Sequence, residues 1–336
     1  MLTEKENAER IIGFGNPDRV GTHVPMQLIS YLGCNHEGYQ EKPNPDSSVW
    51  EDIWGTTWRL ESEYISEMPV NHPISDGWSS VEKYRWPDPD DDRLVSKIYQ
   101  DLETIQDDQD SFLTGFHRDL LLEKGSMLAG MQNLMIWFKT DSELVKFIFQ
   151  RIMDFQLGIA KHYLACNVEM VKFGEDLGGQ TSALFSHEVF EKFLLPEYKR
   201  IFNFYKGKNI KVYFHSCGQI ENFIDDFINL GVDILNPVQA TANNLVLVRE
   251  RTMGKIALEG GVNSSIIMQA DKTALKKEVL HRLLQLGSDG GYFCCPDQKM
   301  PYPEKNIQFI DFLVNKFGKY PLNNECINEE LKNNSS

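Results

Sequence analysis

Hydrophobic and polar positions follow two different spacings along this chain. Short apolar runs predict strands, and each of the later ones precedes a longer segment with apolar residues three and four apart, which predicts a helix. This order repeats over 211–230, 232–253, 255–286 and 291–317. Strands that alternate with helices favour parallel pairing with right-handed crossovers, and eight such units close a barrel.

The earlier part of the chain supplies further barrel elements. Apolar runs at 20–25, 112–115 and 170–173 bring the expected strands to seven, so the eighth is missed or irregular. A helix is predicted at 141–165, which carries an apolar stripe at helical spacing. Neither standard glycine-rich phosphate loop occurs, which argues against a doubly wound nucleotide-binding fold. The sequence therefore predicts a single (β/α)8 TIM-type barrel.

An N-terminal extension precedes most of the barrel. Residues 55–60 alternate like a strand and 68–74 are a plausible partner, which predicts a hairpin laid over the main fold. We expect residues 1–110 to hold this extension and the first barrel strand, and 111–320 to hold the rest of the barrel. A polar C-terminal tail is expected at 321–336, and the whole forms one structural domain.

Composition narrows the functional classes. With 34 basic and 49 acidic residues the net charge is −15, which disfavours binding to nucleic acid or to anionic membranes. No window reaches the roughly 18 apolar residues of a membrane helix, and the N-terminus does not have the pattern of a signal peptide. A cytoplasmic location is expected. The six cysteines are too sparse for a disulfide scaffold, so we expect reduced thiols that are free to bind metal.

The most informative motif is His215-x-Cys217, which follows the apolar run 212–214. Side chains two apart in a strand point to the same face, so these two would converge at the carboxyl end of a strand, where α/β enzymes place their chemistry. A nitrogen and a thiolate suit zinc, and Cys294 and Cys295 are candidates for a third ligand. The competing interpretation is a buried cysteine beside a hydrogen-bonded histidine.

Other polar residues also follow predicted strands. Glu175 and Asp176 are adjacent carboxylates flanked by glycines, so they could orient a ligand, act as acid or base, or contact a metal. Alternatively they cap a neighbouring backbone segment. Further candidates for substrate contacts are residues at strand ends and one tryptophan: His23, Trp54, His117, Asn236, Gln239, Glu259 and Asn263. The alternative for Trp54 is a packing role.

Several motifs together resemble the uroporphyrinogen decarboxylase superfamily. They are the segments Val212–Gly218, Gly231–Gln239, Glu259–Asn263, Gly290–Tyr292 and Pro303–Ile307, with Asn16–Val20 and Glu175–Gln180 upstream. The resemblance covers nearly the whole chain and is densest from about residue 170 onward. It implies a single distorted (β/α)8 barrel, in agreement with the repeated strand and helix units.

Two branches of this superfamily differ where chemistry would occur. The decarboxylase carries an arginine-rich Gln-Ala-Gly-Arg-Tyr motif that grips a polyanionic porphyrinogen, whereas residues 22–27 contain no arginine. The cobalamin-dependent methyltransferases of the coenzyme M type hold zinc with His-x-Cys and a distant cysteine. The resemblance carries these ligands over to His215, Cys217 and either Cys294 or Cys295. The surrounding Pro-Gly-Cys pattern is replaced here, and we favour Cys295 because it lies nearer the loop.

The methyltransferase resemblance implies transfer of a methyl group from a small donor to the Co(I) corrinoid of a separate protein. Zinc and Asp176 would assist the departing oxygen, and the hairpin rich in Trp and Tyr favours a methoxylated aromatic donor. A partner must supply the cobalamin because the chain lacks an Asp-x-His-x-x-Gly signature. The alternatives are a methylcorrinoid:thiol methyltransferase, a decarboxylase, or a barrel without catalysis that serves in binding.

Overall fold

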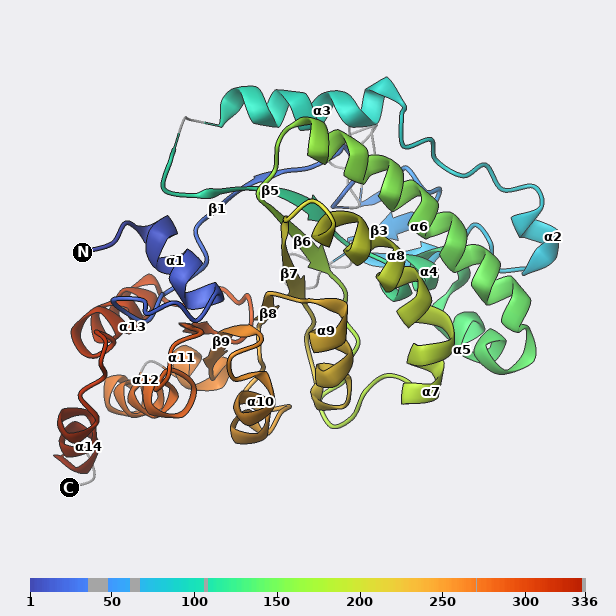
Figure 1. Cartoon of the computed structure of the whole chain (residues 1–336). Helices are drawn as coiled ribbons and strands as arrows, with labels where there is room; N and C mark the ends of the chain where they lie inside the picture. The colour runs from blue at the N-terminus through green and yellow to red at the C-terminus, as the bar shows by residue number, and fades with distance from the viewer. Residues whose placement is uncertain (36–47, 61–66, 106–107, 270, 334–336) are drawn as a thin grey trace.

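A curled sheet of seven parallel strands, covered outside by helices, forms the centre of the computed structural model (Figure 1). The structure describes residues 1–35, 48–60, 67–105, 108–269 and 271–333. The strand order is β1 (Met26–Ile29), β5 (Phe112–His117), β6 (Met170–Gly174), β7 (Lys211–His215), β8 (Ile234–Asn236), β9 (Ala257–Val262) and β10 (Tyr292–Pro296). The predicted α/β TIM-type fold is confirmed.

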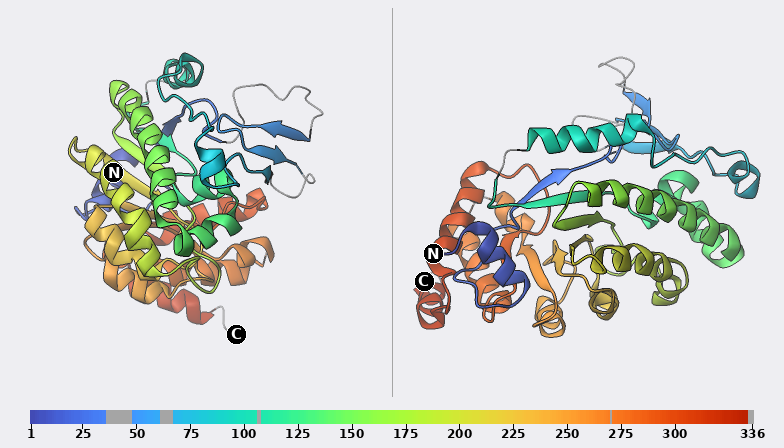
Figure 2. Two further views of the ribbon diagram at one scale, coloured as in Figure 1. Left: turned by 90° about the vertical axis from the view of Figure 1, so that its right-hand side faces the viewer. Right: turned by 45° about the horizontal axis from the view of Figure 1, so that its top comes forward.

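The helices lie mainly outside this sheet, as the views in Figure 2 show. The larger ones are α3 (Asp92–Thr104), α4 (Leu122–Ala129), α5 (Met131–Thr140), α6 (Ser142–Ala165), α8 (Leu195–Lys206), α10 (Leu245–Thr252), α12 (Lys272–Leu286) and α13 (Glu304–Phe317). The shorter ones are α1 (Glu4–Ile12), α2 (Trp78–Val81), α7 (His187–Val189), α9 (Ile224–Leu230) and α11 (Ser264–Gln269), with single turns at Phe190–Leu194 and Glu221–Phe223. The four predicted strand-and-helix units after residue 210 are therefore all present.

The first barrel strand differs from the prediction. We expected it at 20–25, but β1 begins at Met26, because Pro25 has no N–H to donate to a neighbouring strand. Gly21 instead forms a single parallel bridge to Phe293 of β10. A Cβ atom on Gly21 would lie 2.3 Å from the Phe293 ring, so only glycine allows this close approach. The segment from Gly21 to β1 thus closes the sheet between β10 and β5 in two short pieces.

The inner face of the sheet is apolar at its amino-terminal end. Its buried cluster includes Val24, Phe112, Met170, Ile234 and Phe293, which come from the closing segment and four strands. Alternate residues of the same strands belong to the larger cluster beneath the helices. Apolar side chains therefore fill the amino-terminal end of the barrel, and most of its inward polar residues lie toward the carboxyl end of the strands.

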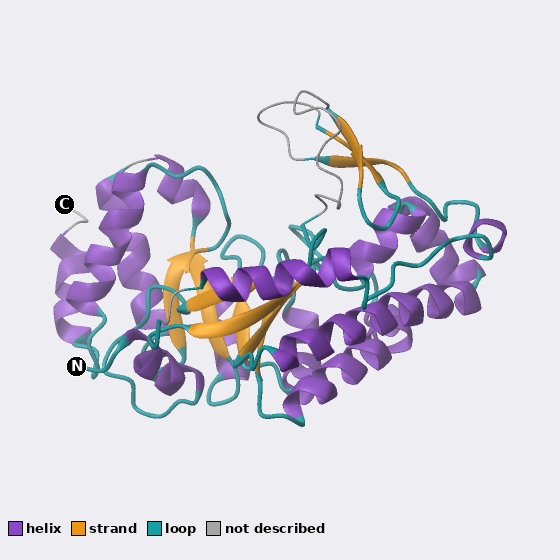
Figure 3. Ribbon diagram, turned by 90° about the horizontal axis from the view of Figure 1, so that it is seen from above, coloured by secondary structure: helices purple, strands orange, loops and turns teal. Residues whose placement is uncertain are grey.

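A separate antiparallel sheet projects from one side of the molecule (Figure 3). Its strands are β2 (Val49–Glu51), β3 (Thr57–Arg59) and β4 (Met68–Asn71), in that order. The predicted hairpin between 55–60 and 68–74 is confirmed in the described residues, while β2 was not predicted. Asp52 stabilises the sheet, since its carboxylate accepts a hydrogen bond from Trp58 Nε1 at 2.9 Å.

The C-terminal segment contains a helix, α14 (Asn324–Asn333). Its residues Ile327 and Leu331 are buried, and the helix contacts α12, so this part of the expected polar tail packs on the barrel. The division at residues 110 and 320 stays a prediction. No helix in the described part of the chain has the length and apolar character needed to cross a membrane.

Candidate metal centre

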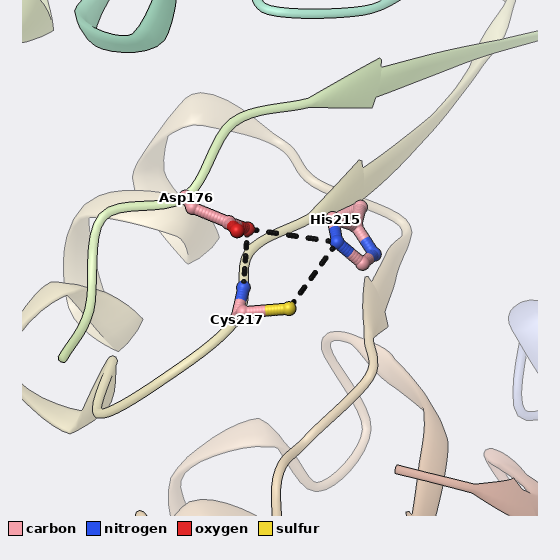
Figure 4. Close-up of side chains that lie close together, drawn as sticks. All are labelled: Asp176, His215 and Cys217. Carbon is pink, nitrogen blue, oxygen red and sulfur yellow. Dashed lines mark hydrogen bonds and ion pairs between the residues drawn. The ribbon is translucent and has the colours of Figure 1, made fainter. Parts of the chain in front are cut away.

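Three potential metal ligands lie together where β6 and β7 end (Figure 4). His215 is the last residue of β7, Cys217 follows two residues later, and Asp176 follows β6 by two residues. The strands pair in parallel with Gly174 opposite His215, so their carboxyl ends meet. The predicted convergence of His215 and Cys217 is present in the structure, and Asp176 joins them.

The distances in this group suit a tetrahedral metal ion. His215 Nε2 lies 3.5 Å from Cys217 Sγ and 3.6 Å from Asp176 Oδ1, and all three ligand atoms lie within 4.8 Å of one another. Ligands about 2.0–2.3 Å from a tetrahedral zinc ion are about 3.3–3.8 Å apart. The side chains of His215 and Asp176 are 32% and 41% exposed, which leaves the group open to an incoming molecule. These residues fit zinc.

Asp176 also holds the loop that carries Cys217. Its Oδ1 accepts a hydrogen bond from the Cys217 backbone N–H at 2.8 Å. Burial and the Asp176 carboxylate raise the pKa of the Cys217 thiol to about 12, so the thiol is protonated in the metal-free site. A bound divalent cation reverses this preference because it stabilises the thiolate directly. Asp176 thus caps the backbone of the Cys217 loop and also lies among the three potential metal ligands.

Two glycines let the ligand-bearing loops approach each other. A Cβ atom on Gly218 would lie 2.1 Å from the carbonyl oxygen of Gly178, and Gly218 has a φ of +78°. The loops are joined by a hydrogen bond of 2.8 Å from Gln219 N–H to the carbonyl oxygen of Gly179. Any side chain at Gly218 would push the loop after β7 away from the loop after β6, and with it Cys217 from Asp176.

A chain of hydrogen bonds fixes the ring of His215. Its Nδ1 lies 2.6 Å from Asn236 Oδ1, and Asn236 Nδ2 donates to Glu259 Oε2 at 2.9 Å. The Glu259 carboxylate also accepts from the Tyr213 hydroxyl and, at 2.9 Å, from the Val24 backbone N–H. Because a carboxylate accepts, the Asn236 amide nitrogen must face Glu259 and its oxygen must face His215. Nδ1 of His215 therefore carries the proton, and Nε2 presents its lone pair to the metal position.

Glu175 points the other way from Asp176. It is fully buried and accepts hydrogen bonds from the backbone N–H of Leu121 and, at 2.9 Å, of Glu123. Burial raises the pKa of Glu175 to about 8. The Glu123 carboxylate in turn accepts from the Asp176 N–H at 3.2 Å. Glu175 is therefore not in the metal group, but it anchors the segment around the start of α4 that supports Asp176.

The two adjacent cysteines of β10 face opposite sides. Cys294 is fully buried on the helical side, where the charges of Glu278 in α12 and Asp311 in α13 act on its thiol. Cys295 faces the inner side, and burial together with the Glu259 carboxylate raises the pKa of its thiol well above the usual value. Cys295 is thus the inward member of the pair, although the group of three within 4.8 Å contains Asp176 in its place.

Comparisons with known proteins identify the family of this fold and site. The sequence matches the family described as Uroporphyrinogen decarboxylase (URO-D) over residues 63–316, which is more than half of the chain. The chain belongs to the URO-D family. Among solved structures, a methyltransferase from Methanosarcina mazei matches with a TM-score of 0.69 and 15% identity, covering 94% of this chain and 99% of that chain. At this identity the likeness shows the shared fold, and no curated protein matches the sequence.

Two of the predicted substrate contacts are buried elsewhere in this URO-D barrel. His117 lies between α6 and α8, where its ring nitrogens are 2.7 Å from Gln156 Oε1 and 2.7 Å from the Tyr205 hydroxyl. Trp54 is 1% exposed and its ring centroid lies 4.7 Å from that of Phe155 in α6. His117 therefore packs between the sheet and its covering helices, and Trp54 packs the N-terminal extension against α6.

Of the other predicted substrate contacts, some hold the loops or the histidine of the metal group and one lies on the protein surface. Gln239 supports the Cys217 loop, since its Oε1 accepts from Gly218 N–H at 3.0 Å. Asn263 accepts from Ser265 N–H at 2.9 Å at the start of α11, and His23 is exposed. Asn236 and Glu259 lie behind His215, as described above. These two residues therefore support the His215 ring without belonging to the metal group.

Two polar residues, one after β10 and one inside the barrel, were not predicted. Asp297 follows β10, is 1% exposed and accepts hydrogen bonds from Ala240 N–H at 2.9 Å and Ser264 N–H at 3.0 Å, which ties three loops together. Lys172 lies in the middle of β6 on the inner face. The place of Asp297 directly after a strand was a usable signal, whereas a lysine inside a short apolar run gave none.

Proposed function

We propose that this protein is a zinc-dependent methyltransferase that moves a methyl group from a small donor, favoured as a methoxylated aromatic, to the Co(I) corrinoid of a separate protein. The observation that carries the proposal is the spacing of His215 Nε2, Cys217 Sγ and Asp176 Oδ1 at the open end of a URO-D barrel. The similarity to a fold neighbour named as a methyltransferase supports the reaction class.

The residues around the group prepare the site in different ways. His215 and Cys217 would hold zinc, with Asp176 or Cys295 as the third ligand, while Asn236 keeps the imidazole in the required tautomer. When bound, zinc supplies Lewis acidity that stabilises negative charge on the substrate oxygen. The corrinoid of the partner would supply a Co(I) nucleophile for the methyl group, and the donor oxygen would keep the electron pair of the methyl–oxygen bond as the leaving group.

Metal analysis of the purified protein tests the first half of the proposal. We expect about one zinc per wild-type chain and a large loss in Cys217→Ala, because this change removes a thiolate ligand. Cys294→Ala is the matched control, since its thiol faces the helices and the variant should keep zinc. The zinc content of Cys295→Ala distinguishes Cys295 from Asp176 as the third ligand. Equal zinc in the wild type and in Cys217→Ala would overturn the site.

A second experiment tests the reaction class. Co(I) cobalamin is mixed with the protein and, in turn, with methoxylated aromatics, methylamines and methanol, while its absorbance is followed. Loss of the Co(I) signal that depends on both protein and donor is the expected result. Failure with every donor, together with release of carbon dioxide from a porphyrinogen in the absence of corrinoid, would identify a decarboxylase instead. Inactivity in both assays would leave a binding protein.

A further inference from the structure

A lysine lies inside the barrel one level below the metal group. Lys172 is opposite Tyr213 in the pairing of β6 with β7, and the next inward pair is Gly174 with His215. Its ammonium nitrogen lies 4.7 Å from the centroid of the Tyr213 ring and 5.8 Å from that of Phe116. Two residues along a strand span roughly 6.6 Å. The backbone of Lys172 therefore lies below the level of Gly174 and His215 by roughly the length of one substituted aromatic ring.

The ammonium group of Lys172 has donors to spare. Among the described residues its close contacts are the two aromatic rings, with no hydrogen bond or ion pair, although the side chain is half-buried. Burial lowers the pKa of Lys172, and the nearby charge of Lys299 adds to this while Glu259 opposes it. Cation–π contacts occupy only ring faces and leave the N–H donors available. A cation held inside a protein is normally paired, so this arrangement suits an anion brought in from outside.

We propose that Lys172 binds the carboxylate of the methyl donor, so that the substrate is a methoxylated aromatic acid and not a neutral aryl ether. The inference rests on the proposed methyl transfer and names its substrate class. The rings of Tyr213 and Phe116 flank the ammonium, and a carboxylate bound there at one end of the substrate ring sets the methoxy group at the other. With a net charge of −15, the chain needs such a local cation to retain an acidic substrate.

Two donors that differ in one group test this assignment. The ratio of kcat/KM for 4-methoxybenzoate to that for methoxybenzene is measured in the wild type and in Lys172→Met. We expect the ratio to fall by about 10- to 100-fold, the scale of a lost charged hydrogen bond. Lys172→Arg should recover part of the preference. Lys208→Met is the control, because Lys208 is exposed in the turn before β7 at the other end of the barrel, and its ratio should not change.

Binding of benzoate alone separates this inference from the proposed function. Calorimetric titration needs no methyl transfer, and circular dichroism confirms that each variant is folded. Benzoate should bind the wild type about 10- to 100-fold more tightly than it binds Lys172→Met. If neither donor is turned over but benzoate binding still depends on Lys172, the anion site stands and the methyl-transfer proposal fails. Equal benzoate affinity, or an unchanged kcat/KM ratio, overturns the assignment of Lys172.

Discussion

Replacing Asn236 by alanine tests whether the hydrogen bonds behind His215 prepare it for metal. The change removes a 2.6 Å contact to His215 Nδ1 and a 2.9 Å donor to Glu259. Each buried polar group left without its partner costs about 1–3 kcal/mol, so the variant should be less stable to urea. The imidazole also becomes free to turn and to move its proton to Nε2. Loss of such a supporting contact lowers metal affinity by about 10- to 100-fold, or about 1.4–2.7 kcal/mol.

Competition with a chromophoric chelator measures the zinc affinity, and urea titration measures the stability of the same samples. Asn133→Ala is the matched control, since Asn133 is also half-buried and donates to the carbonyl oxygens of Ser75 and Ala129 at 3.1 and 2.9 Å. It should lose stability but keep its zinc affinity. A folded Asn236→Ala protein that binds zinc as tightly as the wild type would refute the claim that this chain of contacts orients His215.

Three further predictions concern other parts of the molecule. Asp176→Asn should lower methyl transfer by about 100-fold or more with the circular dichroism unchanged, and undiminished turnover at normal zinc content would remove Asp176 from the site. Gly218→Ala should abolish zinc binding and lower the free energy of unfolding by more than about 2 kcal/mol, because its Cβ would lie 2.1 Å from the Gly178 carbonyl oxygen. Gly254→Ala is the control: Gly254 has a φ of +69° but open space around its Cβ, so the loss should be only about 1 kcal/mol. Burial lowers the pKa of His117 to about 4, so the unfolded chain, with a pKa of about 6.5, binds more protons between these values. The free energy of unfolding of the wild type should therefore fall by up to about 1.4 kcal/mol per pH unit as the pH drops from about 6.5 to 4. His117→Gln should lack this contribution. Curves of stability against pH that run parallel for the two proteins would contradict the prediction.

The barrel could be predicted because its information is local. Each strand from β6 to β10 is a short apolar run, and each following helix has its own apolar stripe, so the order of elements identifies the fold without knowledge of any contact. The approach of His215 to Cys217 follows from strand alternation alone. The approach of Asp176 could be expected in part, because parallel strands place the residues that follow them at one end of the sheet.

Contacts that depend on closure of the barrel could not be predicted in this way. His117 ends β5, but its side chain faces α6 and α8, and alternation within one strand does not say which face becomes the inside. Trp54 looked suited to a substrate mouth because tryptophan often lines binding sites, yet α6 covers it through Phe155. The bridge between Gly21 and Phe293, which closes the sheet ahead of β1, likewise forms only once the sheet has curled round. In each case the deciding contact joins segments far apart in the sequence.

Closure of the barrel and preparation of the metal ligand depend on the same hydrogen bonds. The segment that closes the sheet places the Val24 backbone N–H at 2.9 Å from Glu259 Oε1, and the other oxygen of this carboxylate accepts from Asn236, which faces His215. A shift of the closing segment would remove one hydrogen-bond donor from Glu259. The carboxylate could then move, and Asn236, which donates to it, would move with it. Because Gly21 fixes that segment against Phe293, the N-terminal part of the chain supports a site whose ligands lie some 150 to 200 residues later, without contacting the metal position itself. We therefore expect changes at Gly21 to weaken zinc binding as well as stability, whereas an equally disruptive change on the helical side, away from Glu259, should affect stability alone.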